Sequence, residues 1–142
     1  MDGAATYVLR DIRDSDIEDV RALASKEDME LSDDFSQTFV ANDASGLAGF
    51  CRIRTFGGIA YVNPIVIAQR ARGTGLGRRL MEEAVHRHGE VRFVARGKAV
   101  PFYESIGCVD LPWQDIVDEV AIDCRECSRA EACQPQPMML RA

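Results

Sequence analysis

The spacing of apolar residues along the chain alternates between a pattern typical of strands and one typical of helices. Alternating or continuous apolar runs predict strands at residues 7–10, 39–41, 47–54, 59–62, 65–67 and 91–95, with a candidate last strand at 138–141. Apolar residues three and four positions apart predict helices at 15–24, 74–87 and 98–106 and a further amphipathic piece at 116–121. The acidic segment 26–37 is only weakly periodic and is expected to be a short helix with loops.

The order of these elements predicts an α/β (α+β) fold with a mixed central sheet flanked by helices. Turn-forming residues separate the strands between 39 and 62, which indicates an antiparallel meander. The run at 65–67 is β-branched and is expected to be buried on both faces. A strand, helix and strand then follow in succession, for which a right-handed crossover and parallel pairing are expected. A length of 142 residues fits one domain, in which 113–142 is a cysteine-containing C-terminal extension.

Composition and charge exclude several classes of protein. The formal net charge is −6, so the chain lacks the excess of basic residues with which proteins neutralise nucleic-acid phosphates. No apolar run approaches the length of a membrane span, and no basic and apolar export signal precedes residue 11. We therefore expect a cytoplasmic protein with no nucleic-acid or membrane partner.

The turn between the strand at 65–67 and the following helix is rich in glycine. Gly73, Gly75 and Gly77 alternate there, and glycine lets the backbone approach a ligand closely. The free N–H groups and the dipole at the start of the helix favour an anion, and four arginines lie within ten residues. These features predict a phosphate or pyrophosphate site. The spacing fits neither the nucleotide triphosphate loop nor the dinucleotide fingerprint.

Two motifs in this region resemble those of the GNAT superfamily of N-acetyltransferases. The first is Arg72-x-x-Gly75-x-Gly77, which is similar to the coenzyme A pyrophosphate loop. The second, A-V-P-F-Y-E-S-I-G-C at residues 99–108, resembles the family's Phe-Tyr helix. The resemblance covers about residues 7–110, the span of one ordinary domain. It implies a GNAT-like single domain with two splayed parallel strands and acetyl-CoA as cosubstrate.

The resemblance also implies which residues bind the cofactor. The backbone of Ile65, Val66 and Ile67 is expected to pair with the pantetheine arm. The motifs also place Phe102 at the cofactor. Arg96 is expected to bind either the cofactor or a carboxylate of the acceptor, although a plain surface arginine remains an alternative. The loop residues expected at the pyrophosphate are Arg72, Gly73, Thr74, Gly75, Leu76, Gly77 and Arg78.

In the same way, the resemblance implies catalytic positions. Tyr103 is the candidate general acid for the coenzyme A thiolate, because a phenol can donate a hydrogen bond to developing negative charge. Asn63 stands where many relatives carry a glutamate base, but an amide cannot accept the proton. Asn63 is therefore expected to orient the amine or a water, and no base is assigned.

The predicted reaction transfers acetyl to a primary amine of a small molecule or a protein. Ten carboxylates against three basic residues between positions 11 and 34 would favour a cationic amine, unless they form a solvated helix face. The alternative function is a non-catalytic acyl-CoA-binding regulatory module with a metal- or redox-sensing tail.

The C-terminal segment carries Cys124, Cys127 and Cys133 in the spacing C-x2-C-x5-C. A C-x2-C pair can chelate a structural zinc ion, but such sites normally have four ligands, and the sequence does not select a fourth. A disulfide that closes the tail and inert thiols are the alternatives. Dimerisation through the sheet edge or the tail is also open.

Overall fold

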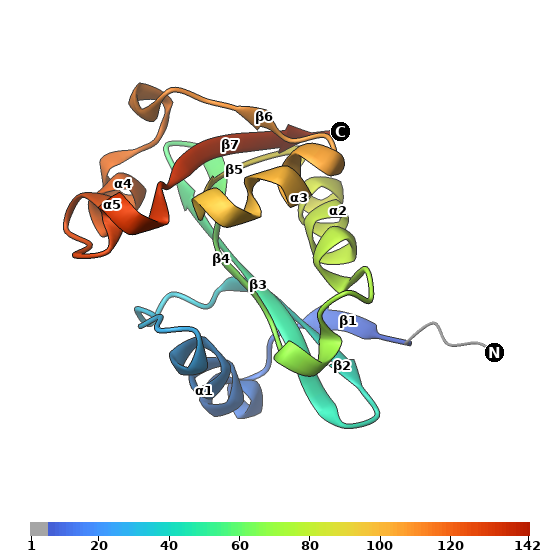
Figure 1. Cartoon of the computed structure of the whole chain (residues 1–142). Coiled ribbons are helices and arrows are strands. Elements are labelled where there is room, and N and C mark those ends of the chain that lie inside the picture. The colour runs from blue at the N-terminus through green and yellow to red at the C-terminus, as the bar shows by residue number, and fades with distance from the viewer. Residues whose placement is uncertain (1–5) are drawn as a thin grey trace.

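The computed structural model describes residues 6–142 as one α/β domain built on a seven-stranded mixed sheet (Figure 1). The strand order is β1-β2-β3-β4-β5-β7-β6. The strands are β1 (Val8–Asp11), β2 (Gln37–Asp43), β3 (Gly46–Phe56), β4 (Ile59–Ile67), β5 (Glu90–Ala95), β6 (Val109–Asp110) and β7 (Gln136–Arg141). The helices are α1 (Ile17–Lys26), α2 (Leu76–His88), α3 (Val100–Ser105), α4 (Asp118–Arg125) and α5 (Ala130–Cys133). Short 3-10 turns are η1 (Asp14–Asp16), η2 (Gln69–Ala71), η3 (Gly97–Ala99) and η4 (Trp113–Asp115).

The predicted elements are largely present, but the expected helix within 26–37 does not form. The meander forms as β2, β3 and β4, and the predicted strands at 59–62 and 65–67 are one continuous strand. The expected short helix within 26–37 is absent, because residues 27–36 follow an irregular path. Phe35 is buried there and Met29 and Leu31 are partly buried, so the apolar residues of this segment anchor a loop.

Helices cover both faces of the sheet because successive residues of each strand point to opposite sides. Phe39 of β2 packs in the cluster that contains α2, whereas Val40 packs in the cluster that contains α1. Tyr61 of β4 meets α4. On β4, Val66 is buried toward α1, while its neighbours at 65 and 67 are only partly buried, so this stretch is not buried on both faces as predicted.

The two parallel strands at the centre of the sheet separate after a short contact. β4 and β5 pair only at Ala60↔Val91 and Tyr61↔Arg92. Just beyond, the β3–β4 register shifts, so that Asn63 and Pro64 together lie opposite Arg52. An extra residue of this kind bends its strand. The edge of residues 62–67 that faces β5 is therefore left without a partner strand, as the family resemblance implies.

The C-terminal segment is part of the sheet, since β7 lies between β5 and β6 and runs antiparallel to both. The strand begins at Gln136, two residues before the predicted start. The turn that precedes β7 crosses Gly97, where an added Cβ would lie 2.8 Å from the carbonyl oxygens of Cys133 and Gln134. The tail is thus packed closely against η3.

We predict that Gly97→Ala destabilises the protein by about 1–3 kcal/mol, because backbone must move to admit the methyl group. Urea unfolding measures this free energy. Gly77→Ala is the comparison variant, since its Cβ would meet side chains alone, Phe102 at 3.3 Å and Ile67 at 4.0 Å, and a smaller loss of stability is expected. Equal free energies of unfolding for wild type and Gly97→Ala would contradict the prediction.

Candidate active site

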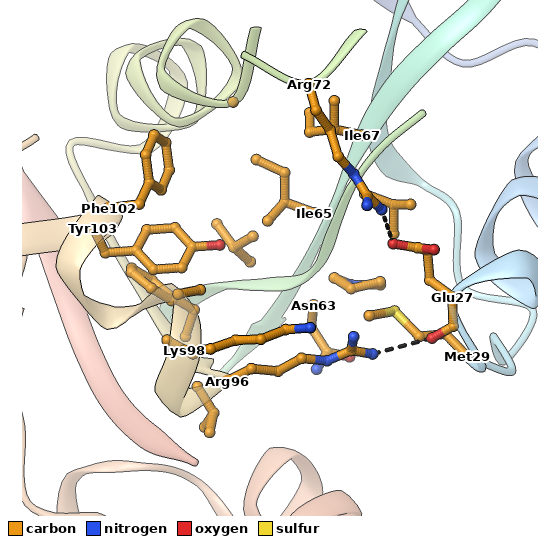
Figure 2. Close-up of a pocket in the computed structure, with 18 of the residues that line it drawn as sticks. Glu27, Met29, Asn63, Ile65, Ile67, Arg72, Arg96, Lys98, Phe102 and Tyr103 are labelled. Atoms are coloured by element: carbon orange, nitrogen blue, oxygen red, sulfur yellow. Dashed lines mark hydrogen bonds and ion pairs between the residues drawn. The ribbon is translucent and has the colours of Figure 1, made fainter. Parts of the chain in front are cut away.

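The gap between the splayed strands holds a cavity of about 570 Å³, which we call the interstrand cavity. This volume lies in the range of small-molecule sites. Figure 2 shows side chains from the strands, the glycine loop, α3 and the segment after α1 around it. The predicted residues that line it are Asn63, Ile65, Val66, Ile67, Arg72, Gly73, Gly75, Leu76, Gly77, Arg96, Phe102 and Tyr103.

The glycine loop forms one end of the interstrand cavity. Gly75 precedes the first residue of α2 with φ of +85°, a conformation that favours glycine. An added Cβ at Gly75 would meet nothing within 4 Å, so the space beside it is open. The first N–H groups of α2 have no partner within the helix and lie at this opening. The loop can therefore hold an anion with backbone groups alone.

Two side chains of the loop are already engaged within the protein. The Thr74 hydroxyl lies 2.9 Å from the Tyr7 hydroxyl and donates to the Ala71 carbonyl at 2.5 Å. Arg78 pairs with Glu82 on the surface of α2 at 3.4 Å. Neither Thr74 nor Arg78 lines the interstrand cavity, although both were expected at the pyrophosphate.

Arg72 does line the interstrand cavity, where its guanidinium forms an ion pair with Glu27 (Figure 2). Glu27 follows α1, 45 residues away in the chain. This contact links the glycine loop to the segment after α1 across the opening. A phosphate bound by Arg72 would therefore compete with the Glu27 carboxylate.

Tyr103 stands on the opposite wall and points its hydroxyl into the interstrand cavity (Figure 2). Its ring packs on Phe93 at a centroid distance of 4.7 Å and on Phe102 at 5.1 Å. Burial raises the pKa of the phenol to about 12. Among residues 6–142 no group forms a hydrogen bond with this hydroxyl, so it is free to donate to a ligand.

Asn63 lies at the bulge of β4 and lines the interstrand cavity. The main-chain carbonyl oxygen of Asn63 accepts a hydrogen bond of 2.8 Å from Nε of the buried Arg52. The Arg52 guanidinium also donates to the Ser32 carbonyl at 3.0 Å. Arg52 therefore fixes the backbone at Asn63 and ties it to the loop after α1. Sequence spacing did not single out this role for Arg52.

The cysteines of the tail are distributed around the same region. Cys124 lines the interstrand cavity, and burial raises the pKa of its thiol. Cys127 and Cys133 line a neighbouring open groove. Within residues 6–142, no three His, Cys, Asp or Glu side chains are grouped so that they could hold a metal ion. The structure therefore gives no support to the zinc site expected from Cys124, Cys127 and Cys133.

The neighbouring groove, of about 1060 Å³, lies between the segment after α1 and the tail, and we call it the side groove. Four residues line both the side groove and the interstrand cavity: Met29, Arg96, Lys98 and Asp123. Of these, only Arg96 was singled out by the motifs. Lys98 follows it by two positions, but Met29 and Asp123 come from distant segments and reach the site only through the fold.

A protein-family model described as an acetyltransferase (GNAT) domain matches residues 34–107, just over half of the chain. The chain belongs to the GNAT acetyltransferase family. The matched residues run from just before β2 to just past the Phe-Tyr helix, so they include the glycine loop, the splayed strands and all but the last residue of the Phe-Tyr motif. A comparison with curated protein sequences finds no significant match.

Solved structures share the GNAT fold. An N-acetylglutamate synthase from Neisseria gonorrhoeae, complexed with coenzyme A and N-acetyl-glutamate, has a TM-score of 0.78 at 14% identity over 96% of this chain. This GNAT domain spans 35% of that protein. The ribosomal-protein-S18-alanine N-acetyltransferase from Escherichia coli has a TM-score of 0.69 at 13% identity. The match covers 96% of this chain and 94% of that protein.

A putative streptothricin acetyltransferase from Bacillus anthracis, in complex with acetyl coenzyme A, gives a TM-score of 0.67 at 15% identity, covering 99% of both chains. These neighbours act on different acceptors, so the fold leaves the acceptor open. None of the helices formed by residues 6–142 of this GNAT domain has the length and apolar character needed to cross a bilayer.

Proposed function

We propose that the protein is an N-acetyltransferase that transfers acetyl from acetyl-CoA to a primary amine by direct attack. The observation that carries this proposal is the interstrand cavity. A glycine loop at a helix N-terminus, an unpaired strand edge and a free phenol line it in the order that acetyl-CoA requires. Coenzyme A in two of the neighbouring structures supports the same cosubstrate.

Each part of the cofactor then has a partner in this chain. The N–H groups around Gly75 bind the pyrophosphate, as expected at a helix N-terminus. The free edge of β4 at 65–67 pairs with the amides of the pantetheine arm, as an added strand would. The acetyl group then lies between Tyr103 and Asn63, at the end of the interstrand cavity next to the side groove.

In the reaction, the amine nitrogen bonds to the thioester carbonyl carbon and the carbon–sulfur bond breaks. The phenol of Tyr103, with its pKa near 12, is a weaker acid than a thiol, whose pKa is about 8.5. Tyr103 therefore stabilises the leaving sulfur by donating a hydrogen bond, and it keeps its own proton at neutral pH. The amine enters from the side groove and loses its protons to water there, and coenzyme A leaves as the thiolate.

The test is acetyl transfer by the purified chain to a panel of amines, with products identified by mass spectrometry and acetyl-CoA binding measured by calorimetry. Binding together with an acetylated product supports the enzyme. Binding of acetyl-CoA without transfer to any amine would support the alternative, a non-catalytic acyl-CoA-binding module. No binding at all would exclude both.

A further inference from the structure

Two cations at the junction of the interstrand cavity and the side groove lack a carboxylate partner. Arg96 and Lys98 line both spaces, and both are exposed. In the described part of the chain, 6–142, neither takes part in an ion pair. Arg96 donates one hydrogen bond of 3.0 Å, to the backbone carbonyl of Glu27. In Figure 2 both side chains extend toward Asn63 and Met29.

In contrast, two neighbouring arginines are neutralised by ion pairs with carboxylates. Arg72 is paired with Glu27, and Arg129 of the side groove is paired with Asp28 at 3.0 Å. Two unpaired positive charges beside each other repel, and a bound anion relieves this repulsion. An arginine and a lysine at the wall of a cavity form suitable donors for a carboxylate.

The anion that they bind is distinct from the cofactor pyrophosphate. The glycine loop provides the pyrophosphate site, and in Figure 2 Arg72 enters the interstrand cavity from the side opposite Arg96 and Lys98. The remaining phosphate of coenzyme A is on the ribose next to the pyrophosphate, on the glycine-loop side of the interstrand cavity. An anion bound by Arg96 and Lys98 therefore belongs to the acceptor. Because Arg96 and Lys98 lie where the acceptor must meet the thioester, the acceptor's anionic group lies close to its reacting amine.

The side groove also offers negative charge for that amine. Glu30, Asp123 and Glu126 line it, and within residues 6–142 none of the three forms an ion pair. A site with free charges of both signs fits a small zwitterion. We infer that the acceptor is a free amino acid, whose α-carboxylate is bound by Arg96 and Lys98 while its α-amine faces the thioester. This assignment rests on the proposed acetyltransferase function.

The experiment compares each of the twenty L-amino acids with its α-amide, which retains the amine and loses the carboxylate. With wild type, at least one free amino acid is expected to be acetylated with a kcat/KM about 10–100-fold above that of its amide, since a charge-assisted contact is lost. The double variant Arg96→Gln with Lys98→Gln is expected to reduce this preference to near unity and to leave the Kd for acetyl-CoA unchanged. Arg125→Gln is the control for charge, because Arg125 pairs with Asp118 and lines neither space.

A second measurement separates this inference from the proposed function. Calorimetry of the same amino acids with the coenzyme A complex detects acceptor binding without turnover. Binding that is lost in the double variant, without acetylation of any amine, would support the amino-acid site and overturn the enzymatic function. A different result would be that amines without a carboxylate are acetylated and that the double variant lowers kcat/KM equally for each acid and its amide. This result would overturn the amino-acid site and leave the acetyltransferase function intact. If no amino acid were bound or acetylated, the amino-acid site would be overturned as well.

Discussion

Gly75→Glu is expected to abolish acetyl-CoA binding, with a Kd raised at least about 100-fold. The new carboxylate would stand at the opening of the glycine loop, beside the first N–H groups of α2, which are the proposed pyrophosphate site. It would repel the phosphates and displace them from their donors. Charge-assisted hydrogen bonds contribute about 1.5–3 kcal/mol each, so the loss of one or two accounts for this factor. Calorimetry with acetyl-CoA measures the change.

The chain offers a matched control for this variant at Gly58, in the turn between β3 and β4. Gly58 has φ of +80°, and an added Cβ would also meet nothing within 4 Å. Gly58→Glu therefore introduces the same charge and a similar backbone strain of about 1–2 kcal/mol, away from the interstrand cavity. Equal loss of stability in both variants, with binding lost only in Gly75→Glu, is the expected result. Tight binding of acetyl-CoA by the Gly75→Glu variant would show that the glycine loop is not the pyrophosphate site.

Tyr103→Phe is expected to lower kcat by about 10²-fold while acetyl-CoA binding stays intact, the scale for removal of one donor from a developing anion. The remaining ring still packs on Phe93 and Phe102, so the wall of the interstrand cavity is preserved. The pKa of Tyr103 is raised to about 12, and a phenol is neutral below its pKa. The wild-type rate should therefore rise with pH as the amine loses its proton, with no decline from Tyr103 until the pH approaches 12.

Tyr61→Phe is the corresponding control, because Tyr61 is a buried tyrosine with a structural hydrogen-bond network. Its hydroxyl accepts from the Val117 N–H at 3.1 Å and donates to the Asp115 carbonyl at 3.4 Å. Removal of that hydroxyl is expected to cost about 1 kcal/mol of stability and to leave kcat unchanged. If Tyr103→Phe behaved in the same way, with normal kcat and reduced stability, Tyr103 would be a packing residue and not a participant in the reaction.

The local parts of the site follow from the sequence. Gly75 and Gly77 stand at fixed offsets from the start of α2, and Phe102 and Tyr103 occupy one turn of α3, so their spacing is set by the backbone. The meander is likewise determined by turn residues between short apolar runs. The expected helix within 26–37 failed because Phe35 finds its place in a long-range cluster, and local periodicity carries no information about that packing.

The partners of the charged side chains could not be predicted from spacing. Arg72 was expected at the pyrophosphate, and it pairs with Glu27 from the far side of the opening. The cysteine pattern suggested a chelate, but Cys124 lines the interstrand cavity while Cys127 and Cys133 line the side groove. Such placements depend on where α4 and α5 pack, which short-range patterns do not encode.

The sequence by itself determined the family, and it located the candidate anion loop and the candidate phenol, because each depends on residues within a few turns of one another. The tertiary structure decided how wide β4 and β5 open, because the bulge at Asn63 and Pro64 is a matter of register between strands. It also decided which residues line the proposed acceptor site. The side groove is lined by Arg96, Lys98 and Asp123 together, which come from different segments. Their proximity depends on the place of β7 beside β5 in the sheet, which packs the tail against η3.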